Sequence, residues 1–247
     1  MACIPGATFT FSEDDPAGTK TRVATVKTFY LDLTEVTFGA FTECVEQGRC
    51  SPPDPPSTEE PSCVWGTDAP ADYPVNCVTW FAARDYCLWR HKRLPTEEEW
   101  DYAARRGTTA NPWGDAPATH AQLNLLGDEW TGGASAFGND GFVYLAPVGS
   151  YPLGATPEGI QDLGGNVWEF TESKYCPYPQ SPCSSCPLDE VCDNPCDACP
   201  DLPHQWVHRG GGWADYPDAN RRWLRWRGYA VGGGRSGVVG FRCAKSR

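Results

Sequence analysis

Glycine and proline account for one residue in five of this chain, and they limit its fold more than any other feature. The 247 residues include 26 Gly and 23 Pro. Both favour turns and interrupt helices and strands, so the sequence predicts many loops and little regular secondary structure. The core must then depend on large side chains. Eleven Trp, ten Tyr and ten Phe supply them, since each aromatic can bury about 150–250 Å².

Thirteen cysteines beside a single methionine favour an oxidising compartment. We therefore expect an extracytoplasmic protein: secreted, periplasmic or at the cell surface. The first residues contain no charged segment followed by an apolar run, which fits a removed signal peptide or a piece of a longer protein. No apolar stretch approaches the roughly 20 residues that span a bilayer, so no membrane span is expected.

The charge is unevenly distributed along the chain. From residue 204 to the end, nine Lys and Arg against two acids give a net charge of +7, whereas the remainder carries −19. This asymmetry predicts either a basic face on an acidic body or arginines that pair with acids inside the fold.

The first third of the chain has clear local signals. Residues 3–32 alternate apolar and polar side chains, which predicts short strands. Thr37 caps a helix that Gly48 ends. Residues 52–61 are rich in Pro and acids and follow no helical or strand period, so we expect a loop there.

Two further helices are predicted before the pattern becomes irregular. Apolar residues recur at helical spacing over 79–91, and Thr96 with Glu99 forms a capping box for a helix that ends at Gly107. No helical period persists beyond Gly107. A second domain would need its own periodic core, so the chain is predicted to be one domain, 1–247, with insertions.

Eight motifs, in order from one end of the chain to the other, resemble the formylglycine-generating enzyme (sulfatase-modifying factor) family. They are residues 4–9 (IPGATF), 34–37 (TEVT), 74–80 (PVNCVTW), 92–100 (KRLPTEEEW), 112–114 (PWG), 164–171 (GGNVWEFT), 209–213 (RGGGW) and 240–243 (GFRC). Each is weak alone, but eight in register are specific. The resemblance implies an α+β, loop-rich, C-type-lectin-like fold with a Cys-rich insertion at about 174–202.

The resemblance also shows what this chain lacks. Active family members bind copper through two cysteines, five positions apart, just after a Gly-Gly-Ser that here reads Gly210-Gly211-Gly212. The matching positions are Asp215 and Asn220, and no cysteine lies between Cys199 and Cys243. Carboxylate and amide groups cannot act as the thiolate ligands that this copper chemistry requires, so no copper is expected.

A related iron-dependent group carries a His-x3-His-x-Glu pattern, and His204 and His208 have the first spacing. No Glu follows, and a proline before and a glycine turn after predict a strand rather than a helix. We therefore predict no metal at these histidines.

The family binds two calcium ions in the second half of its fold, and the resemblance carries both ligand sets over to this chain. The first set is Asn124, the Leu125 carbonyl, Asp140 and the Phe142 carbonyl; the second is Asp162, the Gly165 and Val167 carbonyls, and Glu169. Mixed carboxylate, amide and carbonyl oxygens suit calcium. The alternative is that Asp162 and Asn166 make turns and Glu169 pairs with an arginine.

Twelve of the cysteines can be grouped. The counterparts of Cys87 and Cys243 are disulfide-bonded in the family. Cys44 and Cys50 are close enough for a local bridge, and a Cys63–Cys77 bridge would clamp the Pro-rich loop. Six more lie in the insertion, where disulfides are favoured over zinc: Cys176, Cys183, Cys186, Cys192, Cys196 and Cys199. Cys3 is left without a partner.

With the copper ligands missing, the aromatic and arginine-rich C-terminal region is the candidate binding surface, because Trp, Tyr and Arg dominate binding hot spots. The residues expected there are Asp215, Tyr216, Asn220, Trp223, Arg225, Trp226, Arg227 and Tyr229. Trp206 and Trp213 are expected in the core instead. Two hypotheses follow: a non-catalytic domain that binds a protein or a glycan, or a divergent oxidase with another active-site arrangement. The net charge of −12 argues against nucleic acid.

Overall fold

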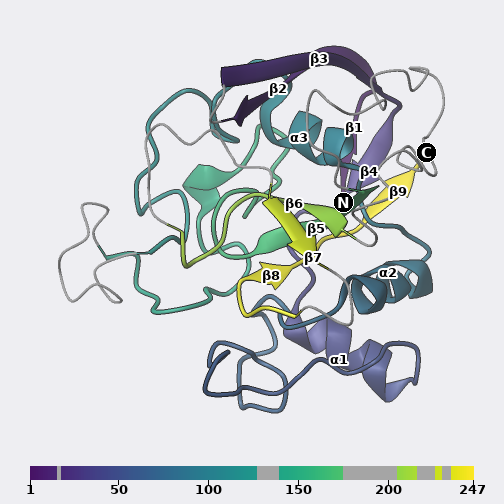
Figure 1. Ribbon diagram of the computed structural model, residues 1–247, viewed down its shortest axis with the longest axis vertical. Coiled ribbons are helices and arrows are strands. Elements are labelled where there is room, and N and C mark those ends of the chain that lie inside the picture. The colour runs from purple at the N-terminus through teal and green to yellow at the C-terminus, as the bar shows by residue number, and fades with distance from the viewer. Residues whose placement is uncertain (16–17, 127–138, 175–204, 216–225, 230–234) are drawn as a thin grey trace.

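A computed structural model describes residues 1–15, 18–126, 139–174, 205–215, 226–229 and 235–247 (Figure 1). These described residues form three α-helices, one short 3₁₀ helix and nine strands in three sheets, joined by long irregular segments. This mixture of few helices, small sheets and many loops confirms the predicted α+β class. Within the described residues, no helix has the length and apolarity to cross a membrane.

The two ends of the chain meet in one three-stranded sheet. Strand β4 (Phe29–Leu31) lies between β1 (Ala2–Ile4) and β9 (Ala244–Ser246), and both pairings are antiparallel. Figure 1 shows β1, β4 and β9 close together near the labelled termini.

A long hairpin follows, formed by β2 (Ala7–Asp15) and β3 (Gly18–Val26). The alternation predicted over residues 3–32 determines which face is inside. The inward-facing positions are Phe9, Phe11, Ala24 and Val26, all buried in the core that contains Trp100 of α3.

The three helices begin where the sequence predicts. Helix α1 (Phe38–Glu46) has Thr37 as its N-cap, and α2 (Trp80–Trp89) has Thr79. In α3 (Glu97–Arg105) both hydrogen bonds of the Thr96–Glu99 capping box are present. Arg106 and Gly107 have φ angles of 53° and 71°, and this left-handed turn ends the helix before the predicted Gly107.

A four-stranded sheet occupies the centre of the molecule in the order β7 (Trp226–Tyr229), β6 (Gln205–Arg209), β5 (Trp168–Lys174), β8 (Val239–Gly240). The prediction of a strand around His208 is confirmed by β6. After Gly107, the 3₁₀ turn η1 (Pro152–Gly154) is the sole helical segment among the described residues.

Aromatic side chains fill the core, as the composition predicts. Trp206 of β6 stacks on Trp80 of α2 with ring centroids 4.2 Å apart, and the Trp80 indole donates to the Thr171 carbonyl at 2.8 Å. Trp206 and Trp213 are both buried, as expected from the sequence.

Three disulfides link six of the described cysteines and confirm the three predicted pairs: Cys44–Cys50, Cys63–Cys77 and Cys87–Cys243. Cys3 is free and exposed. The six cysteines of the insertion lie outside the described residues, so the choice between disulfides and zinc there stays a prediction.

Candidate functional site

The candidate site begins at the turn that follows β6. Gly210 and Gly211 have φ angles of 109° and 106°, which glycine adopts without strain. A Cβ atom on Gly212 would lie 3.0 Å from Trp168 Cδ1 and 3.1 Å from the Val238 carbonyl oxygen. The serine that the family has here would therefore have to displace its neighbours, so this glycine is built into the packing of the turn.

Asp215 closes this turn. Its carboxylate Oδ2 accepts from the Gly212 amide at 2.7 Å, and its own amide donates to the Gly212 carbonyl at 2.9 Å. The Asp215 carbonyl accepts from the Leu126 amide at 3.0 Å. At the position of the first copper-binding cysteine, the chain thus has a half-buried carboxylate that supports the local backbone.

The other residues predicted for ligand binding fall into two groups. Tyr216, Asn220, Trp223 and Arg225 lie outside the described residues. Trp226, Arg227 and Tyr229 belong to β7, of which the backbone is described. Their participation in a binding surface stays a prediction.

Glu169 and Arg242 form a buried ion pair beneath this turn. Both side chains have 0% exposure; Arg242 Nη2 lies 2.7 Å from Glu169 Oε1 and Arg242 Nε lies 2.8 Å from Oε2. The Trp100 indole also donates to Oε2 at 2.7 Å. Of the two roles that the sequence leaves open for Glu169, pairing with an arginine is present.

Two further buried carboxylates lie near this pair. Burial raises the pKa of Asp162 to about 6, although its carboxylate accepts from the Gly149 amide at 2.6 Å. Burial also raises the pKa of Glu35 well above its usual range, and the charges of Asp162 and Glu169 add to this effect. Three buried carboxylates therefore share one guanidinium, that of Arg242, which leaves an excess of buried negative charge.

Asn166 connects the buried acids to the surrounding loops. Its Nδ2 donates to Glu35 Oε2 at 3.0 Å, and its Oδ1 accepts from Asn124 Nδ2 at 3.1 Å and from the Ala146 amide at 2.9 Å. Sequence reasoning missed the roles of Glu35 and Arg242. The signal was present, because each is a charged residue inside a short motif of the resemblance.

The first predicted calcium set contains an unsatisfied acceptor. Asn124 is 1% exposed, and its Oδ1 has no hydrogen-bond partner. The two carboxylate oxygens of Asp140 accept from the amides of Leu125 and Phe142 at 3.1 and 3.0 Å, which folds the two segments together. A cation would satisfy the orphaned oxygen, so these residues fit calcium.

The second set fits calcium less completely. Asp162 and Asn166 have φ angles of 57° and 59°, so both make turns, and Glu169 is bound by Arg242 and Trp100. The excess negative charge of the buried acids still favours a cation.

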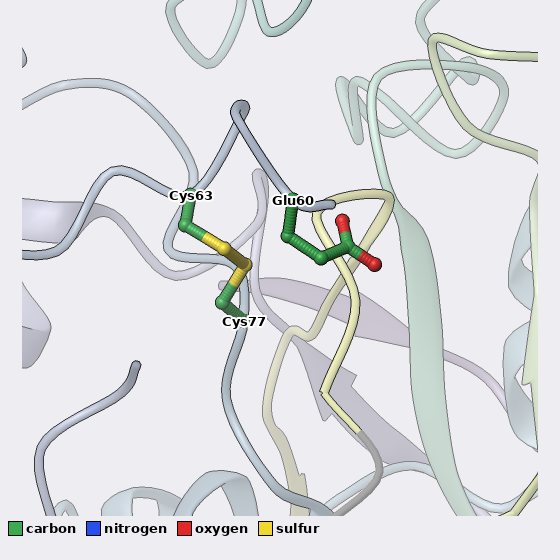
Figure 2. A group of neighbouring side chains, drawn as sticks. All are labelled: Glu60, Cys63 and Cys77. Carbon is green, nitrogen blue, oxygen red and sulfur yellow. A yellow bond between two sulfur atoms is a disulfide. The ribbon is translucent and has the colours of Figure 1, made fainter. Parts of the chain in front are cut away.

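A third group of possible metal ligands contains two cysteines that form a disulfide. Glu60, Cys63 and Cys77 lie together, and Figure 2 shows the carboxylate beside a sulfur–sulfur bond. Because the two sulfurs are bonded to each other, neither is available as a thiolate. His208 is buried in β6, and burial lowers its pKa to about 4, so its imidazole is neutral; the absence of a metal at this histidine stays a prediction.

The basic C-terminal region proves to be partly internal. Arg209 pairs with Asp101 at 2.7 Å, Arg242 pairs with Glu169, and Arg235 pairs with Asp54. For Arg209 and Arg242, pairing with acids inside the fold is the correct one of the two predicted readings, whereas Arg235 pairs with an Asp54 side chain that is 63% exposed.

The fold and this site define the class: a loop-rich α+β domain whose glycine turn carries the Asp215 carboxylate at the position where the resemblance implies a copper-binding cysteine. The domain family described as sulfatase-modifying factor enzyme 1-like matches residues 1–247, and the chain belongs to this family. The resemblance stated from the eight motifs is thereby confirmed.

Similar proteins include active and inactive relatives. The mouse inactive C-alpha-formylglycine-generating enzyme 2 is 30% identical over 290 residues, which cover 100% of this chain and 85% of that protein. The formylglycine-generating enzyme of Mycobacterium tuberculosis is 41% identical over 112 residues, or 44% of this chain and 36% of that protein.

The solved structure of PvdO from Pseudomonas aeruginosa matches with a TM-score of 0.72 at 23% identity, covering 99% of this chain and 93% of that one. At this identity the likeness establishes the fold alone, and it confirms the predicted fold.

Proposed function

We propose that this chain is a non-catalytic, extracytoplasmic member of its family that recognises a protein or a glycan through its C-terminal Trp- and Arg-rich region. The observation that carries the proposal is Asp215. Its carboxylate occupies the first copper-ligand position and accepts from the Gly212 amide at 2.7 Å.

Chemistry supports the loss of the oxidase reaction. A copper site for thiol oxidation needs soft thiolate ligands, and Asp215 and Asn220 offer hard oxygen and amide groups. Gly212 agrees with this, because a Cβ atom there would lie 3.0 Å from Trp168 Cδ1, so a serine would require its neighbours to shift. The full-length similarity to the mouse inactive protein is in line with the same conclusion.

Two features support ligand binding by the C-terminal region: its residue types and the fixed position of Trp213 at its start. Tyr216, Trp223, Arg225, Trp226, Arg227 and Tyr229 are of the residue types that dominate hot spots. Arginine can also stack on aromatic rings as a cation–π partner. The chain enters this region through Trp213, which is buried and fixed by two hydrogen bonds, from its amide to the Asn166 carbonyl and from its indole to the Gly237 carbonyl. Because Trp213 is fixed, the region that follows it loses less conformational freedom when it binds a ligand.

Calcium is proposed as the structural cofactor. Asn124 and Asp140, with the Leu125 and Phe142 carbonyls, would hold one ion. Asp162 and Glu169, with the Gly165 and Val167 carbonyls, would hold the other. The metal would supply cross-links between loops that have few regular hydrogen bonds. The location outside the cytoplasm is supported by the three disulfides.

A divergent oxidase is the second candidate function. The local similarity to the M. tuberculosis formylglycine-generating enzyme favours it, since it covers 44% of this chain at 41% identity. That reading requires a cofactor arrangement that does not use the two missing thiolates.

One experiment separates the two functions. The protein is incubated with copper, oxygen and a Cys-containing sulfatase peptide, and aldehyde formation is measured by mass spectrometry. We expect no turnover and no tight Cu(I) binding by the wild type. The Asp215→Cys/Asn220→Cys variant is the matched control and should gain Cu(I) affinity, because it restores the thiolate pair. Aldehyde formation by the wild type would overturn the non-catalytic proposal.

Binding is tested separately with immobilised wild-type protein on arrays of glycans and of extracellular proteins. A true ligand should be retained by the wild type and lost by Trp223→Ala/Arg225→Ala at an unchanged melting temperature. A ligand that binds both proteins equally would place recognition elsewhere on the domain.

A further inference from the structure

Gly237 lies at a junction of three separate segments. Its amide donates to Glu60 Oε2 at 2.8 Å. Its carbonyl accepts twice, from Asn76 Nδ2 at 2.8 Å and from the Trp213 indole at 3.1 Å. The bond from Trp213 is important because Trp213 and Gly237 lie on the two sides of the proposed ligand-binding region.

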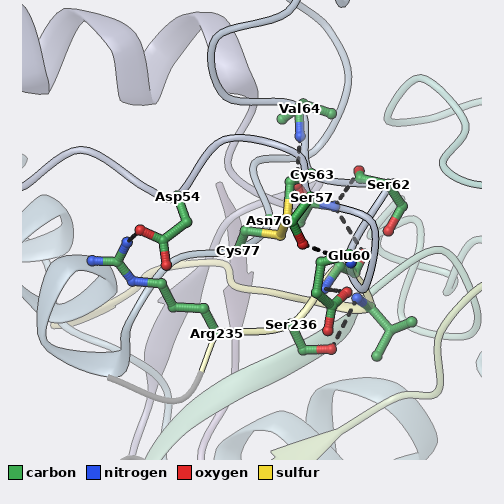
Figure 3. Close-up of a disulfide and its surroundings, with 12 residues drawn as sticks. Asp54, Ser57, Glu60, Ser62, Cys63, Val64, Asn76, Cys77, Arg235 and Ser236 are labelled. Carbon is green, nitrogen blue, oxygen red and sulfur yellow. Dashed lines mark hydrogen bonds and ion pairs between the residues drawn. A yellow bond between two sulfur atoms is a disulfide. The ribbon is translucent and has the colours of Figure 1, made fainter. Parts of the chain in front are cut away.

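The partner of this junction is a short loop closed by the Cys63–Cys77 disulfide (Figure 3). Asn76 lies inside the loop with 0% exposure. Its Oδ1 accepts from the Val64 amide at 3.0 Å, and its Nδ2 donates to the Ser62 carbonyl at 2.8 Å as well as to Gly237. A single buried amide side chain therefore holds the disulfide loop closed and attaches it to the C-terminal segment.

Two further contacts strengthen the attachment. The Cys77 amide donates to the Ser236 carbonyl at 3.1 Å, and Cys77 has a φ angle of 55°, a conformation that few non-glycine residues adopt. Arg235 and Asp54 form an ion pair at the edge of the junction, as Figure 3 shows.

The junction leaves no free space at Gly237. A Cβ atom there would lie 1.9 Å from Ser62 Oγ and 2.8 Å from Glu60 Oε2. The Ser62 and Glu60 side chains thus fill the space beside Gly237, so a larger residue at this position would have to displace them.

From these contacts we infer that the Cys63–Cys77 loop is a clamp that positions both ends of the C-terminal ligand-binding region, with Asn76 and Gly237 as its positioning residues. The purpose of the clamp rests on the proposed function. A Trp- and Arg-rich segment binds with less ordering cost when its ends are fixed in advance. The clamp holds these ends at Trp213 and Gly237.

Amide hydrogen exchange, followed by NMR, tests the clamp without any ligand. Asn76→Asp keeps the side-chain shape but replaces the two donated hydrogen bonds with repulsion between oxygens. We expect at least tenfold faster exchange at the Cys77, Trp213 and Gly237 amides, while the Trp100 amide in α3 exchanges as in the wild type. Asn111→Asp is the matched control, because Asn111 also donates to a backbone carbonyl, that of Ala116, but at an exposed position.

Each outcome is decisive. Equally faster exchange at the Trp100 amide would mean that Asn76 contributes only to global stability. Unchanged exchange at the Trp213 amide would show that Asn76 does not fix the ends of the C-terminal region. Either result overturns the inference. Should Asn76→Asp fail to fold, Cys63→Ala/Cys77→Ala is compared with Cys44→Ala/Cys50→Ala, and selective acceleration is expected in the first pair alone. A confirmed clamp in a protein that retains no ligand on the arrays would leave this inference intact and reject the binding function.

Discussion

His208 is a single buried imidazole with a measurable effect on stability. Burial lowers its pKa to about 4 from the ordinary value of 6.5, so it is neutral in the folded protein at pH 6. The unfolded chain binds a proton between pH 6.5 and 4 that the folded chain does not. Stability contributed by His208 is therefore complete above pH 6.5 and falls as the pH decreases, by about 3 kcal/mol in total.

The test compares the wild type with His208→Gln, which cannot become charged. The difference in the free energy of unfolding between the two proteins should change in the variant's favour as the pH falls from 7 to 4.5, measured by urea denaturation. Asp162, whose pKa is raised to about 6, titrates in the opposite sense in both proteins, so subtraction removes its effect. A pH-independent difference would contradict the assigned burial of His208.

The Glu169–Arg242 pair should be among the most sensitive points of the core. Arg242→Met leaves Glu169, Glu35 and Asp162 buried without their guanidinium, and we expect a loss of about 3–5 kcal/mol. Asp85→Asn is the control, because the Arg84–Asp85 pair is more than 40% exposed on both sides and should contribute less than about 1 kcal/mol. Thermal unfolding in EDTA gives both values. If Arg242→Met lowered the free energy of unfolding as little as Asp85→Asn does, the buried pair would not be needed for stability.

The sequence predicts which residues occupy the positions of the copper-binding cysteines but not which hydrogen bonds these residues form. Asp215 and Asn220 follow from the motif order. The hydrogen bond from the Gly212 amide to Asp215 is local, but the contact of Arg242 with Glu169 joins residues 73 positions apart in the chain. No local pattern encodes such contacts, so they required the structure.

Helix ends are the part of the fold that the sequence predicts best, because caps depend on residues three positions apart. Thr37 and the Thr96–Glu99 box both occur as expected. The parallel pairing of β5 with β8 could not be predicted, since it joins Trp168 to Val239 and β8 has two residues. A strand this short has no period to detect.

The N-terminal cap of α3 should contribute measurably to stability. Thr96→Ala removes the side chain that accepts from the Glu99 amide and should lower the free energy of unfolding by about 1 kcal/mol. Thr119→Ala, in an exposed loop, is the control and should change it by less than about 0.5 kcal/mol. Chemical denaturation of both variants measures the two effects. A cap variant as stable as the control would show that packing alone holds α3.

For the molecule as a whole, calcium should raise the melting temperature. Ligand present at one hundred times its dissociation constant stabilises the folded state by about 2.7 kcal/mol. EDTA should lower the melting temperature, added calcium should restore it, and Asn124→Ala should reduce the response because it removes the orphaned buried oxygen. An unchanged melting temperature, with no metal found by elemental analysis, would reject the calcium proposal.

The central position of β4 between the first and last strands has a consequence for biosynthesis. On the ribosome, Phe29–Leu31 has β1 as its one neighbour until β9 has been synthesised, far along the chain. Cys87 likewise waits for a partner 156 residues further along, and all the other cysteines of the sequence emerge before that partner. Oxidation of the nascent chain thus risks incorrect bridges, and refolding from the reduced state should be accelerated by a disulfide isomerase.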